Sequence, residues 1–345
     1  MKKGEIYEGV IEKIDFQNKG RVKIADTTVT VKNGIPGQKV RFMINKKRGG
    51  RVEGRLLEVL EKSEMEKRDP VCSIFPACGG CMYQTMLYED QLKMKEEQIK
   101  KLFDDVVDHE YTFEPIKGSP MEFAYRNKME FSFGDEFKDG PMTLGMHKRG
   151  SFYDIVTVDQ CVLVHPDCCK ILRATLDYFT EHGAVFYKKM AHVGYLRHLL
   201  VRRGVKTGEI LVDLVTSTQT EGTWKSDKNK EALLEGWKEK LLGLDLEGSF
   251  AGILHTENDS LADVVQNDRT VILYGQDFFM EELLGLKFKI TPFSFFQTNS
   301  LGAEVLYQTA REYIGDSLDE KADKIVYDLY SGTGTIAQIL APAAK

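Results

Sequence analysis

The sequence lacks any apolar run that approaches the roughly 20 residues needed to span a membrane. It also lacks an apolar block after its first residues, because Met1-Lys2-Lys3-Gly4-Glu5 leads into alternating residues, so no secretory signal peptide is indicated. The composition is that of an ordinary globular chain, with 42% hydrophobic and 29% charged residues. We therefore expect a cytoplasmic monomer that does not associate with membranes, and its 345 residues predict two or three domains.

An overall excess of basic residues is also missing, since 47 Lys and Arg are outnumbered by 53 Asp and Glu, for a net charge of -6. Residues 1 to 70 differ from this mean, because they carry 17 Lys or Arg against 11 Asp or Glu. A basic segment on an acidic chain indicates a local face for a polyanion, although a solvated lysine-rich surface would give the same count.

Short alternating runs fill the first sixty residues, with turn residues between them. Five such runs predict a small closed barrel of the OB type over residues 1–60. The expected strands are Ile6–Ile14, Arg21–Ile24, Thr28–Val31, Lys39–Ile44 and Arg51–Val59. A loop between the last two would project cations from the barrel rim, where they could neutralise phosphates: Lys46, Lys47, Arg48 and Arg51.

The middle of the chain is expected to be β-rich. A helix is predicted over 84–104, with Tyr88, Leu92, Lys95, Ile99, Leu102 and Phe103 on one face. Two more helices are expected near 168–181 and 229–242. Strands are predicted over Tyr125–Gly134, Ser151–Val158, His198–Arg203 and Glu209–Val215, the last two joined as a hairpin.

Near the end of the chain, a helical pattern over Gly302–Ile314 precedes a short apolar run, Ile325–Tyr330, and a glycine turn with a second helical start. Strand, glycine loop and helix open a doubly wound α/β domain. The loop lacks the third glycine of the dinucleotide fingerprint, because Ala337 stands there, so Asp328 before Gly332-Thr333-Gly334 fits S-adenosylmethionine better than NAD. A plain structural turn remains an alternative. Upstream, the amides of Gln297 and Asn299 could contact the amino-acid tail of a ligand and a base edge.

Three cysteines lie within ten residues, Cys72, Cys78 and Cys81, in a Cys-x5-Cys-x2-Cys pattern. Cys161 is the best candidate for a fourth ligand, with Cys168 and Cys169 in reserve. Three clustered thiolates and one remote thiolate favour a 4Fe-4S cluster, while zinc stays open and disulfides are disfavoured in a cytoplasmic chain. The spacing differs from that of radical enzymes that cleave S-adenosylmethionine, so a structural or RNA-positioning cluster is favoured over a redox one.

Further blocks complete a resemblance. The chain resembles the bacterial RNA 5-methyluridine methyltransferases of the RlmD/TrmA type over essentially its whole length. The blocks that carry it, besides the cysteines, are Tyr125-Arg126-Asn127-Lys128, Leu196-Arg197-His198, Thr207-Gly208-Glu209 and Phe295-Phe296-Gln297-Thr298-Asn299.

The resemblance implies a TRAM-like barrel at 1–60, a central iron-sulfur and RNA-binding region at 61–280, whose helix at 84–104 could pack on the catalytic domain, and the start of a Rossmann-like methyltransferase domain at 281–345. It implies that Cys72, Cys78, Cys81 and Cys161 hold a 4Fe-4S cluster. S-adenosylmethionine would contact residues of the Gln block and the glycine loop, namely Gln297, Asp328, Tyr330, Gly332 and Thr335. RNA would contact Arg126, Lys128 and Phe295 in addition to the barrel cations.

The resemblance also implies a mechanism. A Cys thiolate adds to C6 of uracil, C5 takes the methyl group, and a carboxylate removes the C5 proton. The base would have to be exposed or flipped. In the family the nucleophile and base lie downstream of the glycine loop, beyond Lys345, so we expect no catalytic residue in this chain and no activity from it alone. The expected RNA is 23S ribosomal RNA, with transfer RNA possible.

Two other functions stay open. A non-catalytic RNA-binding protein with an iron-sulfur or zinc element fits the same features. A nucleotide-dependent oxidoreductase is disfavoured, because it would need the missing third glycine and an acid for the ribose.

Overall fold

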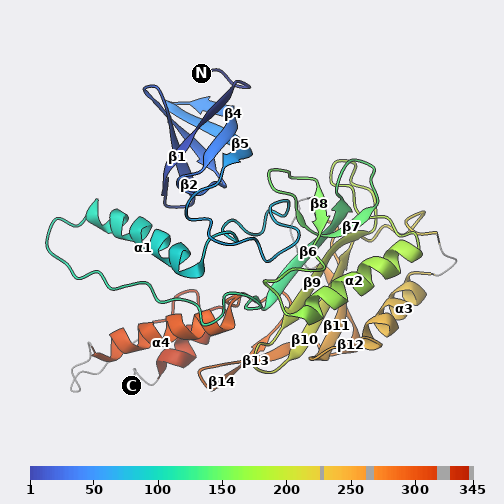
Figure 1. The fold of residues 1–345 in the computed structure, drawn as a ribbon. Helices are drawn as coiled ribbons and strands as arrows, with labels where there is room; N and C mark the ends of the chain where they lie inside the picture. The colour runs from blue at the N-terminus through green and yellow to red at the C-terminus, as the bar shows by residue number, and fades with distance from the viewer. Residues whose placement is uncertain (226–228, 262–267, 317–326, 342–345) are drawn as a thin grey trace. The chain divides into compact units, whose positions relative to one another are not determined.

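The computed structural model describes residues 1–225, 229–261, 268–316 and 327–341 (Figure 1). They form two compact units, Met1–Gly118 and Ser119–Lys345. These units meet after Gly118, whereas the functional domains expected from the sequence meet at 60/61 and 280/281. The functional domains remain a prediction. Within the described residues, no helix combines the length and the apolar character that crossing a bilayer requires.

The first unit begins with the predicted barrel. Its five strands are β1 (Ile6–Asp15), β2 (Lys19–Ile24), β3 (Thr27–Lys32), β4 (Lys39–Arg48) and β5 (Arg51–Glu61). They close in the order β1-β2-β3-β5-β4, with only β3 and β5 parallel. Alternate side chains such as Ile11, Val22, Val31 and Phe42 fill the interior, which confirms the period-two pattern read from the sequence.

Helix α1 (Tyr88–Asp104) begins four residues later than predicted. Its buried residue is Met94, which joins Tyr83 and Met86 in the barrel core. The predicted apolar face was wrong at its end, since Leu102 is 43% and Phe103 48% exposed. Phe103 instead packs against the rings of Tyr111 and Phe113 in the segment that follows the helix.

The second unit is built on one seven-stranded sheet. Its strands are β6 (Lys128–Asp135), β7 (Met142–His147), β8 (Ile155–Thr157), β9 (Leu196–Arg203), β10 (Glu209–Thr216), β11 (Ser249–Glu257) and β12 (Arg269–Gly275), in the order β12-β11-β10-β9-β6-β7-β8. The hairpin of β9 and β10 is confirmed. Only β10 and β11 are parallel, because the chain between them crosses over through a helix.

Helices α2 (Pro166–Glu181) and α3 (Lys230–Leu242) lie where the sequence predicts them and cover one face of this sheet (Figure 1). The two other predicted strands were too long. Of residues 125–127 only Arg126 forms isolated bridges, and 151–154 form a turn in which the Ser151 hydroxyl accepts from the backbone of Tyr153 and Asp154. Strands β7, β11 and β12 were not predicted.

A smaller layer follows the sheet. It contains the hairpin β13 (Phe279–Leu283) and β14 (Leu286–Ile290), then α4 (Ser300–Asp316) and α5 (Thr335–Leu340). Phe279, Phe288, Phe296, Tyr307 and Ile339 form its core. The two predicted helical segments are confirmed, but the strand expected at Ile325–Tyr330 is not, because Tyr327–Tyr330 are irregular or turn residues and the two before them lie outside the described part of the chain.

Candidate functional site

The segment between β14 and α4 carries Gln297 and is held by its backbone carbonyls. The Arg202 guanidinium donates to the oxygen of Pro292 at 3.0 Å and to that of Ser294 at 2.5 Å. Arg202 is 1% exposed, and this burial lowers its pKa to about 10 while Glu130 opposes the shift. The buried Arg202 guanidinium therefore holds the backbone of this loop in place.

Asn127 holds the next part of the same loop. Its side-chain nitrogen donates to the Gln297 carbonyl at 2.8 Å, and its backbone nitrogen donates to the Thr298 carbonyl at 2.9 Å. Two blocks more than 160 residues apart in sequence therefore meet at one place, Tyr125–Lys128 and Phe295–Asn299. The Thr207–Glu209 block joins them through β13, because Thr207 donates to the Met280 carbonyl and Glu209 accepts from the Met280 nitrogen.

Tyr307 on α4 lies beside the Gln297 side chain. Burial raises the pKa of the Tyr307 hydroxyl, the interaction with the Gln297 side chain partly lowers it, and the negative charge of Asp328 raises it. The Tyr307 hydroxyl is therefore hydrogen-bonded to the side chain of one predicted cofactor residue, Gln297. Neither the Tyr307 ring nor its role was predicted, since an aromatic on a helical face is usually part of a core.

The glycine loop has the tight geometry that its sequence predicts. Tyr330, Gly332 and Gly334 all have positive φ angles, of 66°, 55° and 69°. Asp328 accepts a hydrogen bond from the backbone nitrogen of Ala337 at 3.0 Å and so fixes the start of α5. Glycine is needed at two of these positions because a side chain there would be strained.

Tyr330 and Thr335, two other predicted cofactor residues, differ in exposure. The Tyr330 side chain is fully exposed. Thr335 is 6% exposed, and its hydroxyl is hydrogen-bonded to that of Thr333 at 2.7 Å. In this arrangement the Thr335 hydroxyl helps to order the loop, and its contact with a cofactor stays a prediction.

Asn299 has a structural role in this loop, and its expected ligand contact stays a prediction. Its side-chain oxygen accepts from the backbone nitrogen of Gly302 at 2.8 Å, and its side-chain nitrogen donates to the Ser119 hydroxyl at 2.9 Å. It is thus the N-cap of α4. A polar residue before a helical run could have signalled this from the sequence.

The predicted RNA contacts of this unit are unequal. Phe295 is 74% exposed, which suits stacking on a base. Arg126 donates to the Lys128 carbonyl at 2.9 Å, and Lys128 forms an ion pair with Glu130 at 2.5 Å. Both cations are half-buried and order the start of β6.

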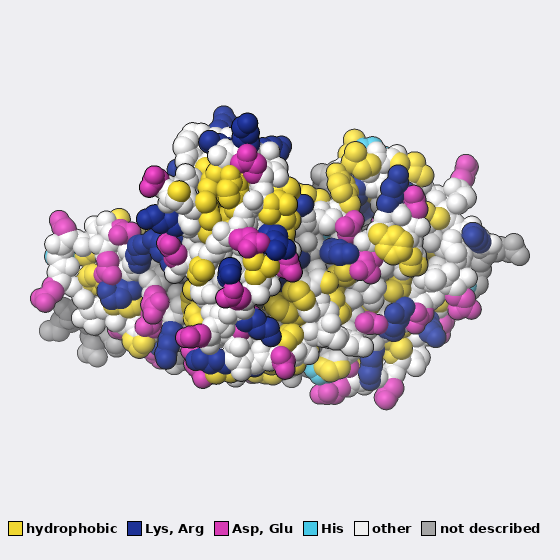
Figure 2. All heavy atoms as spheres, turned by 45° about the horizontal axis from the view of Figure 1, so that its top comes forward, with side chains coloured by type: hydrophobic (Ala, Val, Ile, Leu, Met, Phe, Trp, Pro, Cys, Tyr) yellow, Lys and Arg dark blue, Asp and Glu magenta, His cyan; other side chains and the backbone are white. Residues whose placement is uncertain are grey.

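The barrel cations lie at the hairpin of β4 and β5. Gly49 and Gly50 form the turn, so Lys46, Lys47 and Arg48 extend β4 and Arg51 begins β5, rather than all lying in a loop. All four are exposed, and Figure 2 shows basic side chains gathered over this end of the barrel. Lys46 lies 3.8 Å from Glu53, an exposed pair of little strength.

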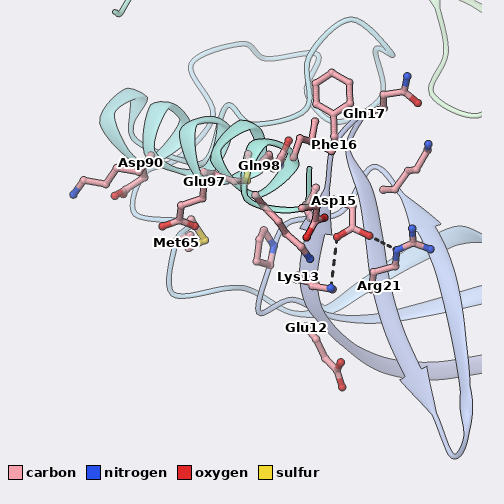
Figure 3. A pocket seen from close by; sticks show the side chains of 18 residues that line it. Glu12, Lys13, Asp15, Phe16, Gln17, Arg21, Met65, Asp90, Glu97 and Gln98 are labelled. Carbon is pink, nitrogen blue, oxygen red and sulfur yellow. Dashed lines mark hydrogen bonds and ion pairs between the residues drawn. The ribbon is translucent and has the colours of Figure 1, made fainter. Parts of the chain in front are cut away.

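A groove of about 760 Å³ lies between the β1–β2 hairpin and α1 in the first unit (Figure 3). Phe16 and Leu102 are among its apolar walls. Its cations are balanced by acids such as Asp15, which pairs with Arg21 at 2.7 Å and Lys13 at 3.7 Å. The groove is therefore a poor polyanion site by charge.

The three clustered cysteines lie in the first unit, in a segment without helix or strand. Cys72 is buried, and its backbone nitrogen donates to the Gln84 side chain at 2.9 Å. The Gly80 nitrogen donates to the Cys78 sulfur at 3.3 Å, the type of contact that stabilises a thiolate ligand. Cys161, the predicted fourth ligand, belongs to the second unit.

Across the described residues, no group of three or more His, Cys, Asp or Glu side chains is arranged to hold a metal ion. Zinc would need its sulfurs about 2.3 Å from one point. A 4Fe-4S cluster is larger and gives each thiolate its own iron. The soft donor set and the Gly80 contact fit such a cluster, which remains a prediction.

The reserve cysteines are on α2. Cys168 is buried, and burial raises the pKa of its thiol to about 12, so it stays protonated. Cys169 is half-buried and donates to the Cys161 carbonyl at 3.7 Å. Cys168 is therefore a neutral thiol in the metal-free chain, and Cys169 lies beside Cys161, the predicted ligand.

The chain is similar to known proteins in sequence and in fold. No family model matches the sequence. An uncharacterized RNA methyltransferase of Clostridium tetani is 47% identical over 345 residues, which cover 100% of this chain and 72% of that protein. Another from Caldanaerobacter subterraneus is 42% identical, with 100% and 73% covered.

Among solved structures, the chain is similar to the crystal structure of Pyrococcus abyssi tRNA (uracil-54, C5)-methyltransferase in complex with S-adenosyl-L-homocysteine. The TM-score is 0.66 at 24% identity, and the match covers 97% of this chain and 70% of the other. This likeness shows a shared fold.

Proposed function

The chain belongs to the RNA methyltransferases, and from this premise we propose that it serves the transfer of a methyl group from S-adenosylmethionine to C5 of a uridine in RNA. The observation that carries the proposal is that Asn127 fixes the backbone of the Gln297 loop, while Asp328 in the glycine loop accepts from the backbone of α5. The fold neighbour acts on uracil C5 and was solved with the demethylated cofactor, which supports the same chemistry here.

S-adenosylmethionine, when bound, supplies the methyl group. Gln297, on a loop whose carbonyls are fixed, would orient the amino-acid part of the cofactor, and Asp328 and Gly332 would border it at the turn. Exposed Tyr330 would close over it, while Thr335 would act only by ordering the loop. Fixed backbone contacts reduce the entropy lost when a ligand binds.

RNA is the proposed substrate, with 23S ribosomal RNA favoured over transfer RNA by the resemblance. The barrel cations would neutralise phosphates and Phe295 would stack on an unpaired base. Arg126 and Lys128 would act mainly by ordering β6, since both are engaged within the protein. Comparing the affinity for a 23S fragment with that for a transfer RNA decides between the two substrates.

Binding of S-adenosylhomocysteine, measured by calorimetry, tests the cofactor site without requiring turnover. We expect Gln297→Ala to weaken binding at least about tenfold, because it removes a contact worth on the order of 1.5 kcal/mol. Gln308→Ala is the matched control, because Gln308 is an exposed amide on α4 that bonds only Glu312. Equal affinities for the two variants would refute the assignment of Gln297.

Cys72, Cys78, Cys81 and Cys161 are the proposed ligands of a 4Fe-4S cluster. Anaerobically purified protein should contain about four irons and four sulfides per chain and absorb near 400 nm. Cys81→Ala should lose them, whereas Cys168→Ala should keep them because Cys168 is not among the proposed ligands. Zinc in place of iron, or no metal, would contradict the cluster.

No cysteine among the described residues is proposed as the nucleophile, since four are assigned to the cluster, Cys168 is protonated and Cys169 lies against the Cys161 carbonyl. The alternative function that the sequence leaves open is RNA binding without catalysis. Titration with S-adenosylhomocysteine separates the two, because a protein that only binds RNA needs no site for a methyl donor.

A further inference from the structure

Glu281 on β13 is a fully buried carboxylate with no part in the function described above. We propose that Glu281, Ser300 and Asn127 form a hydrogen-bonded relay that positions Gln297 and thereby sets the affinity for the cofactor. The proposal rests on the proposed function for its last step, the contact of Gln297 with S-adenosylmethionine. The three are positioning residues, because each acts through another residue.

The relay begins at Glu281, which accepts four hydrogen bonds. The backbone nitrogens of Val205, Lys206 and Glu282 donate to it at 2.8, 3.2 and 3.0 Å, and the Ser300 hydroxyl donates at 2.7 Å. A buried carboxylate is stable only when such donors replace water. Glu281 therefore ties the turn between β9 and β10 to the first residue of α4.

Ser300 passes this constraint on with a fixed direction. A hydroxyl has one proton, and since Ser300 gives it to Glu281, its oxygen must act as the acceptor for the Asn127 side-chain nitrogen at 2.8 Å. The second proton of that nitrogen goes to the Gln297 carbonyl, also at 2.8 Å. Both protons of the Asn127 amide are thus used, and its orientation is fully determined.

The relay ends at the backbone of Gln297, the residue whose side chain meets Tyr307. Its members are deeply buried, at 0% exposure for Glu281, 1% for Ser300 and 4% for Asn127, so water cannot replace a lost partner cheaply. The carboxylate, hydroxyl and amide lie on three separate sequence segments. Together the three side chains hold the Gln297 carbonyl in place. Packing of the core alone does not require this.

Hydrogen exchange tests the relay directly, on the full chain with Ser300→Ala, Ser300→Thr and the control Ser249→Ala, whose side chain is exposed on β11. We expect Ser300→Ala to speed exchange of the amides at 296–299 by about tenfold or more while β9 and β10 stay protected, because only the loop is released. Ser300→Thr keeps the hydroxyl and should restore the protection.

Cofactor binding is the second readout. Ser300→Ala should raise the Kd for S-adenosylhomocysteine by roughly fivefold or more, since a loosened loop must be ordered again on binding, and Ser300→Thr should recover it. Uniformly faster exchange across the unit, or no change at 296–299, would overturn the relay. If the unmodified chain does not bind S-adenosylhomocysteine at all, the proposed function fails, while the exchange at 296–299 still decides the relay.

Discussion

At the scale of single residues, the sheet of the second unit buries two titratable groups on neighbouring strands. Asp213 accepts from the Thr256 hydroxyl at 2.9 Å, and its other oxygen has no partner among the described residues. Burial raises the pKa of Asp213 to about 7, against the smaller opposite effect of Thr256. Burial also lowers the pKa of His255 to about 4, so both groups are neutral in mildly acidic solution.

These two shifts predict opposite effects of pH on stability. Asp213 binds its proton more tightly in the folded state, so its contribution is lost as the pH rises from about 4 to 7, by roughly 4 kcal/mol. His255 binds its proton more weakly in the folded state, so stability is lost as the pH falls from about 6.5 to 4, by roughly 3 kcal/mol. Urea denaturation across this range should show Asp213→Asn gaining stability with rising pH and His255→Gln losing it.

The control for this series is Asp277→Asn, because Asp277 is exposed and its replacement should leave the profile unchanged. A profile of Asp213→Asn parallel to that of the unmodified chain between pH 4 and 7 would mean that Asp213 ionises normally despite its burial. A profile of His255→Gln parallel to that of the unmodified chain would mean that His255 does not cause the predicted loss of stability at low pH.

At the scale of the elements, the proposed RNA contact of the barrel can be tested at the hairpin of β4 and β5. Lys47→Ala and Arg48→Ala should each weaken RNA binding and reduce the slope of log K against log salt by about 0.7, since each cation releases counterions from single-stranded RNA. Fluorescence anisotropy at several salt concentrations measures this slope. Lys240→Ala, at an exposed site on α3, should leave it unchanged.

A slope that stays the same in the two barrel variants would place the RNA elsewhere. A weaker affinity with an unchanged slope would point to a loss of packing in the barrel, which the thermal stability of each variant would reveal.

At the scale of the whole molecule, the chain forms two units with separate cores. Both tryptophans, Trp224 and Trp237, belong to the second unit, and Trp237 is fully buried there. Tryptophan fluorescence therefore follows the unfolding of that unit alone, whereas circular dichroism follows both.

Phe42→Ala should separate the two transitions. The ring is fully buried in the barrel, so its loss should destabilise the first unit by about 3 to 5 kcal/mol. Circular dichroism should show an earlier transition while the fluorescence midpoint stays the same. An equal shift of both signals would show that the two units unfold as one.

The sequence alone determined what depends on local pattern. Alternation fixed the five barrel strands, the helical period located α2, α3, α4 and α5, and the glycine turn was recognised because Gly332 and Gly334 meet a backbone need that few residues meet. The resemblance to RNA methyltransferases also rested on linear blocks, which is why it preceded any structure.

Only the tertiary structure decided what depends on partners far apart in the chain. The place of Asn299 before a helical run indicates a cap, but no local signal gives the Gln297 side chain its partner, which is Tyr307 in the fold. Likewise, nothing in the local sequence marks Arg202 and Glu281 as buried charges. Folding buries them against the carbonyls and amides of other segments. A buried charge takes its role from its partners, and those partners are brought to it only by the fold.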